Sequence, residues 1–277
     1  MNLLPSIART PETNRSVRLS NGGKRRLLAV RGEPLFLADW ERVLFIHYEV
    51  DAGALRKEVP FEIDLWQGRA LVSVVAFNMR DMRPRRGGRI AAWPFKPIST
   101  HPFLNVRTYV KHEGEPGIYF MTEWLSNRLS VLLGPLIYGL PYRFARIDYK
   151  HTHEQGALAG RVQAPGRSGS FTFEARLGSP LSFDSCLSDS QDEFLLERYT
   201  AFTSSGSTRR FFRIWHPPWP QVPVEISVSD DSILTSLWPW FRKARLLGAN
   251  YSPGFRDVWM GWPRLVKQIS PISSENR

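Results

Sequence analysis

Cysteine is the scarcest residue type in this sequence of 277 residues, which contains Cys186 and no other. A single cysteine excludes an internal disulfide bond. Its neighbours, Ser185 and Leu187, supply no cation that would lower the pKa of the thiol, so the sequence does not favour a catalytic cysteine. This usage is typical of proteins in a reducing compartment, and we expect a cytoplasmic protein.

Long apolar runs are also missing. The most apolar stretch, residues 129–140, is about a dozen residues long and contains Gly134 and Pro135. A helix that spans a bilayer needs roughly 20 apolar residues, so we expect a core helix here and no membrane span. Polar residues and a proline interrupt residues 1–7, which therefore lack the apolar centre of an export signal.

Several motifs of common chemistries are absent. The sequence has no Gly-x-Ser-x-Gly elbow, no phosphate-binding glycine-rich loop and no dinucleotide-binding fingerprint. His151 and His153 are two residues apart, but no cysteine or acidic pair at metal-ligand spacing accompanies them. The sequence therefore implies neither a metal site nor a cofactor.

The net charge of +11 is concentrated in two segments. Residues 1–31 carry seven basic residues against one acidic residue, and residues 80–89 carry five against one. The rest of the chain is therefore close to neutral. Basic arms can bind nucleic acid through its phosphates, but solvated arms of this composition are common, and the pattern does not favour nucleic-acid binding.

Hydrophobic periodicity predicts three parts: a flexible basic arm over residues 1–33, one β-rich domain over residues 34–266 and a tail over residues 267–277. Within the domain, residues 83–97 contain many arginines, glycines and prolines and predict a mobile loop over one end of a sheet. Many antiparallel strands with few helices indicate an α+β domain around a closed or strongly curved sheet.

The clearest hairpin lies between residues 104 and 124, where two alternating strands flank turn residues 113–117. Alternation places Asn105, Arg107 and Tyr109 on one face of the first strand. That face can be either a solvent side or the wall of a pocket. Ser126 is the expected N-cap of the apolar helix that follows the hairpin.

Six blocks of sequence, in this order, resemble the YqjF-like uncharacterised bacterial family (domain of unknown function 2071). The blocks span about residues 35–265 and read LFIHYEVDAGALRKEVP, DLWQGRALVSVVAFNMRDMRP, LNVRTYV, GIYFMTEW, IYGLPYRFARI and NYSPGFRDVWMGWPRL. The resemblance implies a distant relationship to acetoacetate decarboxylase. It also implies that protein's fold, an antiparallel β-barrel or cone with a few surrounding helices and a buried pocket.

In acetoacetate decarboxylase, a lysine at the end of a helix forms a Schiff base with the substrate, and a neighbouring lysine lowers its pKa. The resemblance places Tyr142 at the first of these positions and Arg143 at the second. A phenol cannot form an imine, and an arginine stays protonated, so the Schiff-base mechanism is not expected here.

From these patterns we expect a cytoplasmic protein that binds a small, carboxylate-bearing organic molecule in a barrel pocket. Two alternative functions stay open at this point: a lyase or isomerase, and a nucleic-acid-associated protein acting through its basic arms. The sequence also leaves open whether the protein forms a homo-oligomer. Arg107 can grip a carboxylate through two hydrogen bonds or pair with Glu123, and His47 is either a site residue or a strand histidine with its partners in place. The candidate ligand-binding residues are Asn105, Arg107, Tyr109, Arg143 and His47, and the candidate acid and base are Tyr142 and Glu123.

Overall fold

Strands form most of the regular secondary structure in the computed structural model, which describes residues 15–166, 168–179 and 181–266. The strands are β1 Phe36–Val50, β2 Glu62–Ile63, β3 Ala70–Pro84, β4 His101–His112, β5 Glu115–Leu125, β6 Tyr142–Phe144, β7 Arg146–Thr152, β8 Ala157–Gln163, β9 Ser170–Arg176, β10 Thr200–Ser205, β11 Thr208–Trp215, β12 Val222–Asp230, β13 Arg245–Met260 and β14 Arg264–Leu265. The α-helices are α1 Arg15–Leu28, α2 Ala52–Glu58, α3 Gly88–Ala92, α4 Arg128–Tyr138, α5 Gln191–Leu196 and α6 Ser232–Leu237. The 3₁₀ helices are η1 Trp93–Ile98, η2 His153–Gln155 and η3 Pro239–Lys243.

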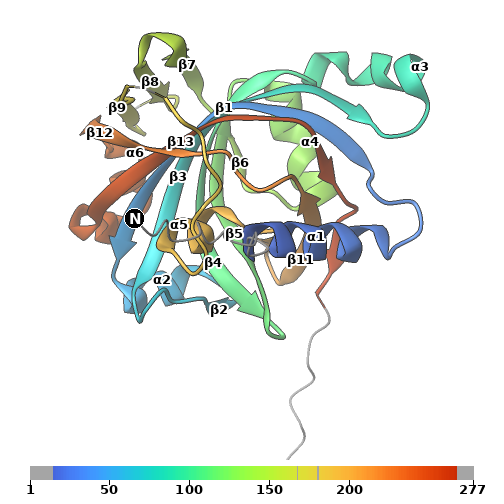
Figure 1. Ribbon diagram of the computed structural model, residues 1–277, viewed down its shortest axis with the longest axis horizontal. Helices are drawn as coiled ribbons and strands as arrows, with labels where there is room; N and C mark the ends of the chain where they lie inside the picture. The colour runs from blue at the N-terminus through green and yellow to red at the C-terminus, as the bar shows by residue number, and fades with distance from the viewer. Residues whose placement is uncertain (1–14, 167, 180, 267–277) are drawn as a thin grey trace, which may run out of the picture.

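The main sheet closes into a ring, in agreement with the predicted α+β barrel or cone (Figure 1). The strands follow one another in the order β11-β10-β5-β4-β3-β1-β13, and β13 then pairs with β11. Strands β12, β9, β8 and β7 continue from β13 as a wing beside the ring. Most neighbours are antiparallel, as expected, but β10 and β6 both run parallel to β5.

Residues 43–48 of β1 and 70–77 of β3 are buried on both faces because they lie between two hydrophobic cores. Leu44 and Ile46 belong to the core that includes wing residues such as Phe171. Val43 and Phe45, which alternate with them, belong to the second core, inside the ring. A strand buried on both faces reads as a nearly continuous run of β-branched and aromatic residues, as both of these strands do.

The N-terminal segment is helical from Arg15 to Leu28, so the prediction of a flexible arm is wrong for these residues. The buried face of α1 is formed by Ser16, Ser20, Gly23 and Leu27. Three of these four residues are small, and they let the helix backbone approach its neighbours closely. An analysis of apolar periodicity misses such a face, because its spacing is helical but its side chains are not apolar. Residues 1–14 and the predicted tail, 267–277, lie outside the described residues.

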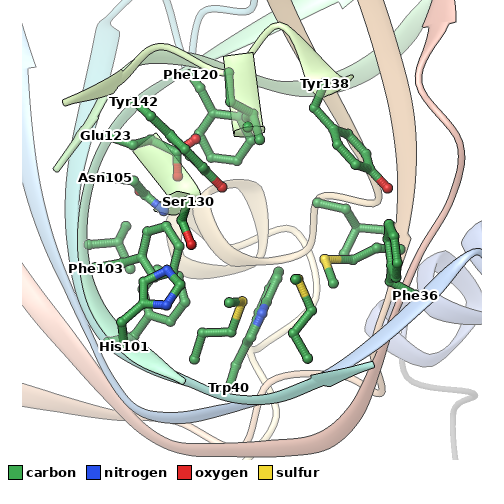
Figure 2. Close-up of a pocket in the computed structure, with 18 of the residues that line it drawn as sticks. Phe36, Trp40, His101, Phe103, Asn105, Phe120, Glu123, Ser130, Tyr138 and Tyr142 are labelled. Carbon is green, nitrogen blue, oxygen red and sulfur yellow. The ribbon is translucent and has the colours of Figure 1, made fainter. Parts of the chain in front are cut away.

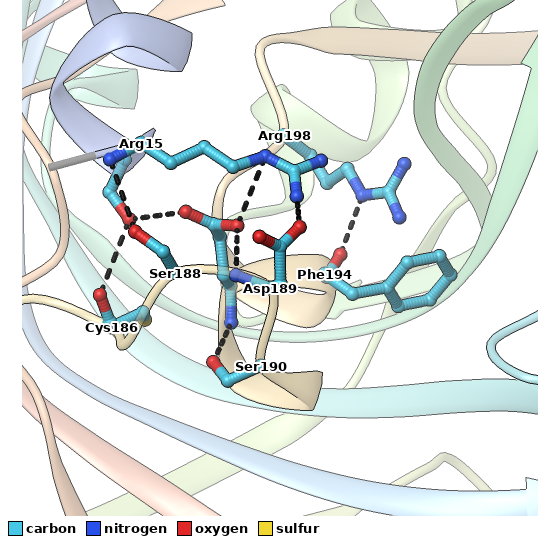
Figure 3. Close-up of polar contacts among 9 residues, drawn as sticks. Arg15, Cys186, Ser188, Asp189, Ser190, Phe194 and Arg198 are labelled. Atoms are coloured by element: carbon cyan, nitrogen blue, oxygen red, sulfur yellow. Dashed lines mark hydrogen bonds and ion pairs between the residues drawn. The ribbon is translucent and has the colours of Figure 1, made fainter.

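Helix α1 is attached to α5 by polar contacts (Figure 3). The guanidinium of Arg15 forms ion pairs with Asp189 and Glu193, and the hydroxyl of Ser16 donates to Glu193 Oε1 at 2.9 Å. Farther along the helix, Lys24 lies 4.4 Å from the ring centre of Trp215. Some of the basic residues assigned to the arm are therefore engaged in contacts within the chain.

The predicted mobile loop is also replaced by regular structure. Strand β3 extends to Pro84, and α3 and η1 occupy the remainder of residues 83–97. Arg80 pairs with Glu41 at 3.0 Å, and Arg83 pairs with Asp81 at 3.1 Å and with further acids. The composition suggested a loop because prolines and glycines usually interrupt regular structure. A proline is nevertheless tolerated in the first turn of a helix, as in η1.

Helix α4 lies at one end of the ring and is not the core helix that its sequence predicts. Leu132 is 62% exposed and Leu136 is 71% exposed, because the protein contacts one side of this helix and solvent the other. Asn127, rather than Ser126, is the N-cap and accepts a hydrogen bond from the Ser130 amide at 3.0 Å. None of the described helices is long and apolar enough to cross a membrane.

Candidate functional site

A cavity of about 150 Å³ lies inside the ring, bordered by α4 and η1 (Figure 2). Most of its wall is apolar, with Trp40, Phe45, Phe77, Phe103 and Phe120 among the lining residues. Figure 2 shows His101, Asn105, Glu123, Ser130 and Tyr142 on one side of the cavity, opposite Phe36 and Tyr138. The cavity therefore has an apolar body with one polar wall.

Three residues of the polar wall form a row across adjacent strands. In the strand register, Asn105 of β4 is paired with Glu123 of β5, and Glu123 is paired with Tyr142 of β6. Gly134 of α4 makes room for the phenol, since a Cβ atom at this position would lie 2.2 Å from Cε2 of Tyr142. The row brings together three of the residues expected from the sequence, and all three line the cavity.

Arg107, the fourth expected residue that lines the cavity, is a buried cation. It follows a register irregularity between β4 and β5 and is 7% exposed. Its Nη2 donates to the carbonyl of Leu195 at 3.3 Å, and its guanidinium lies 5.2 Å from the ring centre of Phe45. Burial lowers the pKa of this guanidinium, although arginine remains charged in proteins.

Arg107 and Glu123 do not form the ion pair that was one alternative. No ion pair joins them in the described part of the chain, and Arg107 Nε and Glu123 Oε1 are both buried without a hydrogen-bond partner there. Burial raises the pKa of Glu123 to about 8, although the charge of Arg107 opposes this shift. Burial, together with the nearby Glu123, also raises the pKa of Tyr142 well above its usual value. At neutral pH both groups are therefore protonated, and the polar wall carries the positive charge of Arg107.

Replacing Glu123 by glutamine is expected to make the free energy of unfolding less dependent on pH. The pKa of Glu123 is raised in the folded protein from 4.5 to about 8. Between these values the unfolded chain releases a proton that the folded chain retains, so the free energy of unfolding should fall as the pH rises and level off above about 8. Urea denaturation of both proteins between pH 5 and 9 measures the difference. Parallel curves would show that Glu123 ionises normally.

Two further polar residues of the wall, His101 and Ser130, were not expected from the sequence. His101 is 5% exposed and Ser130 is 7% exposed. Neither ring nitrogen of His101 nor the hydroxyl of Ser130 has a hydrogen-bond partner among the described residues. Burial lowers the pKa of His101 to about 4, so its imidazole is neutral at pH 7. Extending the alternation of Arg107 and Asn105 backward through Phe103 reaches His101, a signal that was present in the sequence.

The other three expected residues do not line the cavity. Tyr109 and His47 belong to a buried hydrogen-bond chain, in which the Ser73 hydroxyl lies 2.5 Å from the Tyr109 hydroxyl and 2.7 Å from Nδ1 of His47. Nε2 of His47 lies 3.0 Å from Oδ1 of Asn250, so this histidine has its partners in place. Arg143 is exposed, because strand alternation directs it away from the side on which Tyr142 lies.

The closed ring of strands with an internal cavity defines an acetoacetate decarboxylase-like fold. Acetoacetate decarboxylase from Legionella pneumophila is similar to this chain with a TM-score of 0.58 and 15% identity, over 84% of this chain and 87% of that one. The enduracididine biosynthesis enzyme MppR, with HEPES buffer bound, is similar with a TM-score of 0.58 and 16% identity, over 86% of this chain and 89% of that one. An acetoacetate decarboxylase-like enzyme from Sphingomonas wittichii RW1 is similar with a TM-score of 0.57 and 14% identity, over 86% of this chain and 95% of that one.

Sequence comparison identifies the family more narrowly. The chain belongs to the family DUF2071, an uncharacterized conserved protein, whose model matches residues 37–239. The uncharacterized protein YqjF of Bacillus subtilis (strain 168) is 30% identical over 203 residues, which cover 70% of this chain and 78% of that protein. The expected family and the expected fold are both confirmed.

Proposed function

We propose that this protein binds a small, largely apolar organic anion in the cavity of the ring, without Schiff-base chemistry. The observation that carries the proposal is Arg107, a buried cation at the polar wall that has no ion-pair partner among the described residues. A buried charge is destabilising unless it is paired, and a ligand carboxylate would supply the missing partner.

The rest of the cavity limits the kind of anion. Its volume of about 150 Å³ resembles that of engineered apolar cavities that accept a single benzene ring. Aromatic, aliphatic and methionine side chains make up most of the lining, and they favour an apolar body over a sugar or a polyanion. The protonated Glu123 can donate a hydrogen bond to the same carboxylate instead of repelling it.

A covalent imine is not part of the proposal. Among the described residues, those that line the cavity include no lysine. The resemblance to acetoacetate decarboxylase also implies that Tyr142 stands where the Schiff-base lysine would be. Without an amine, binding has to rest on charge, hydrogen bonds and apolar contact.

The proposal is tested by isothermal titration calorimetry with phenylacetate and with phenylacetamide, which have the same shape but differ in charge. We expect phenylacetate to bind and the neutral amide to bind at least about tenfold more weakly, because a charge-assisted hydrogen bond contributes about 1.5–3 kcal/mol. Equal affinities would contradict the role of Arg107. Absence of binding by phenylacetate and by a panel of other short apolar carboxylates would contradict the proposed function.

A second candidate function, enolisation of a bound carbonyl compound, has one observation in its favour. The pKa of Glu123, raised to about 8, is close to the range in which a carboxylate is an efficient general base. The ionised form of Glu123, which becomes more populated as the pH rises toward 8, would remove a proton from the carbon beside the carbonyl, and the Tyr142 hydroxyl would donate to the enolate oxygen. Exchange of that proton for deuterium in D₂O, followed by NMR, tests this candidate. Exchange that is unchanged in a Glu123→Gln variant would contradict it.

The basic segments give weaker support to nucleic-acid binding than their charge alone suggests. Arg15, Arg80 and Arg83 form ion pairs within the chain, and Lys24 stacks on aromatic rings. Cations already paired with acids have less to gain from phosphates. Binding of a small anion is therefore the function that we propose.

A further inference from the structure

The polar wall contains two groups, the His101 ring and the Ser130 hydroxyl, that the binding of a carboxylate to Arg107 does not need. Both side chains are more than nine-tenths buried, and both line the cavity. Figure 2 shows Ser130 and His101 on the same side of the cavity as Asn105. Buried polar groups are normally hydrogen-bonded, so an unpartnered pair at a cavity wall points to a group on the ligand.

The chemistry of the pair identifies the group that it fits. A neutral imidazole has one donor and one acceptor, and a hydroxyl likewise donates and accepts. A carboxylate offers acceptors alone, and an ammonium group offers donors alone. A hydroxyl group on the ligand satisfies both kinds of atom, whereas either ion would leave one kind unpartnered.

The distance between the two polar ends of the wall sets the length of the ligand. Asn105 and His101 lie on one face of β4, four residues apart, with Phe103 between them. A strand rises about 3.3 Å per residue, so their Cα atoms are roughly 13 Å apart. Because Phe103 lies between them, a ligand that reaches both ends of the wall needs its two polar groups separated by at least the length of an aromatic ring, as in a ring substituted at opposite ends.

The section of wall between these ends is aromatic. The ring centre of Phe103 lies 4.6 Å from that of His101 and 5.1 Å from that of Phe77, with the two phenylalanine rings inclined by 8°. Tyr142 lies 5.8 Å from Phe103, ring centre to ring centre. A planar aromatic ring on the ligand would join this group through offset or edge contacts.

We infer that the ligand is a hydroxylated aromatic monocarboxylic acid whose two polar groups stand at opposite ends of the ring. Its carboxylate pairs with Arg107 and Asn105, its ring lies beside Phe103, and its hydroxyl exchanges hydrogen bonds with His101 and Ser130. This inference rests on the proposed function, because it concerns the same cavity. It adds a second set of hydrogen bonds, those between His101, Ser130 and the ligand hydroxyl, and thereby specifies the chemical class of the ligand.

Calorimetric titration of the full chain with three probes tests the inference. The probes are 4-hydroxyphenylacetate, phenylacetate and 2-hydroxyphenylacetate, which share the carboxylate and differ in the hydroxyl. We expect the first to bind about 10- to 100-fold more tightly than phenylacetate, since a site built to pair a hydroxyl discriminates against its absence. The 2-hydroxy isomer should gain nothing, because its hydroxyl lies too close to the carboxylate to reach His101.

Variants separate the two parts of the site. Ser130→Ala, with or without His101→Phe, should remove the preference for the 4-hydroxy probe, so that the ratio of its affinity to that of phenylacetate falls to about one. If wild type binds all three probes equally, the inference is wrong while the proposed function stands. If none of them binds, the inference is wrong, and the proposed function fails as well when the panel of other short apolar carboxylates does not bind either. The comparison of the isomers uses wild-type protein and so does not depend on the folding of any variant.

Discussion

Replacing Arg107 by methionine is expected to weaken the binding of phenylacetate roughly 30-fold or more, because truncating one partner of a buried charge pair costs about 2–5 kcal/mol. The ligand carboxylate would enter an apolar cavity with no cation to receive it. The free protein should be at least as stable as wild type, since methionine fills similar space and removes a buried charge without an ion-pair partner in the described chain. Calorimetry gives the affinity, and urea denaturation gives the free energy of unfolding.

Arg198 offers a matched control, because it is also a buried arginine but lies outside the cavity lining. Its Nη1 pairs with Asp64 at 2.8 Å. Breaking such a pair typically destabilises a protein by about 3–5 kcal/mol, although Lys111, 2.8 Å from the same carboxylate, should reduce the loss. Arg198→Met should therefore lower stability and spare affinity in the folded protein. The reverse pattern for the two arginines would contradict the assignment of Arg107.

The largest effect on stability is expected from Gly254→Ala, with a loss of about 4 kcal/mol or more in the free energy of unfolding. Gly254 has φ of +97°, and an added Cβ would lie 1.8 Å from the carbonyl oxygen of Trp40. The two strands pair here, with Glu41 opposite Gly254, so relieving the overlap requires β1 and β13 to separate. Because both strands belong to the ring, we expect either a large shift in the urea midpoint or poor recovery of folded protein.

Gly32→Ala is the control for backbone strain alone. Gly32 has a similar φ of +93°, but an added Cβ there would meet no atom within 4 Å. Its substitution should cost about 1–2 kcal/mol, the strain of a left-handed conformation. Equal losses for the two variants would mean that the contact with Trp40 contributes nothing.

The central hairpin and most of the polar wall could be predicted from local pattern. Alternation in β4 places Asn105 and Arg107 on one face, and the turn at residues 113–117 brings β5 alongside. The register counted from the turn would place Thr122 opposite Asn105. The irregularity between Val106 and Arg107 shifts the pairing by one residue and brings Glu123 there instead, which local pattern does not predict. The same alternation also places Tyr109 on this face, but its position farther along β4 puts it in the hydrogen-bond chain with Ser73.

The position of Arg143 and the exposure of α4 show where local pattern misled. Tyr142 and Arg143 are adjacent, and in a strand adjacent side chains point to opposite faces, so one alone can reach the cavity. The apolar residues of α4 predicted burial, yet Leu132 and Leu136 face outward because α4 covers the end of the ring and has no layer above it in the described structure. Apolar composition predicts a helix but does not say how many of its sides are covered.

The amino-acid sequence by itself determined the family, the α+β class and the central hairpin, because these depend on residue identity and on short-range periodicity. Tertiary structure alone decided that Arg107 has no ion-pair partner among the described residues, that Glu123 retains its proton near neutral pH, and that His101 and Ser130 meet at one wall. Those properties arise from desolvation and from contacts between strands and helices distant in the chain, and no local pattern encodes either of them.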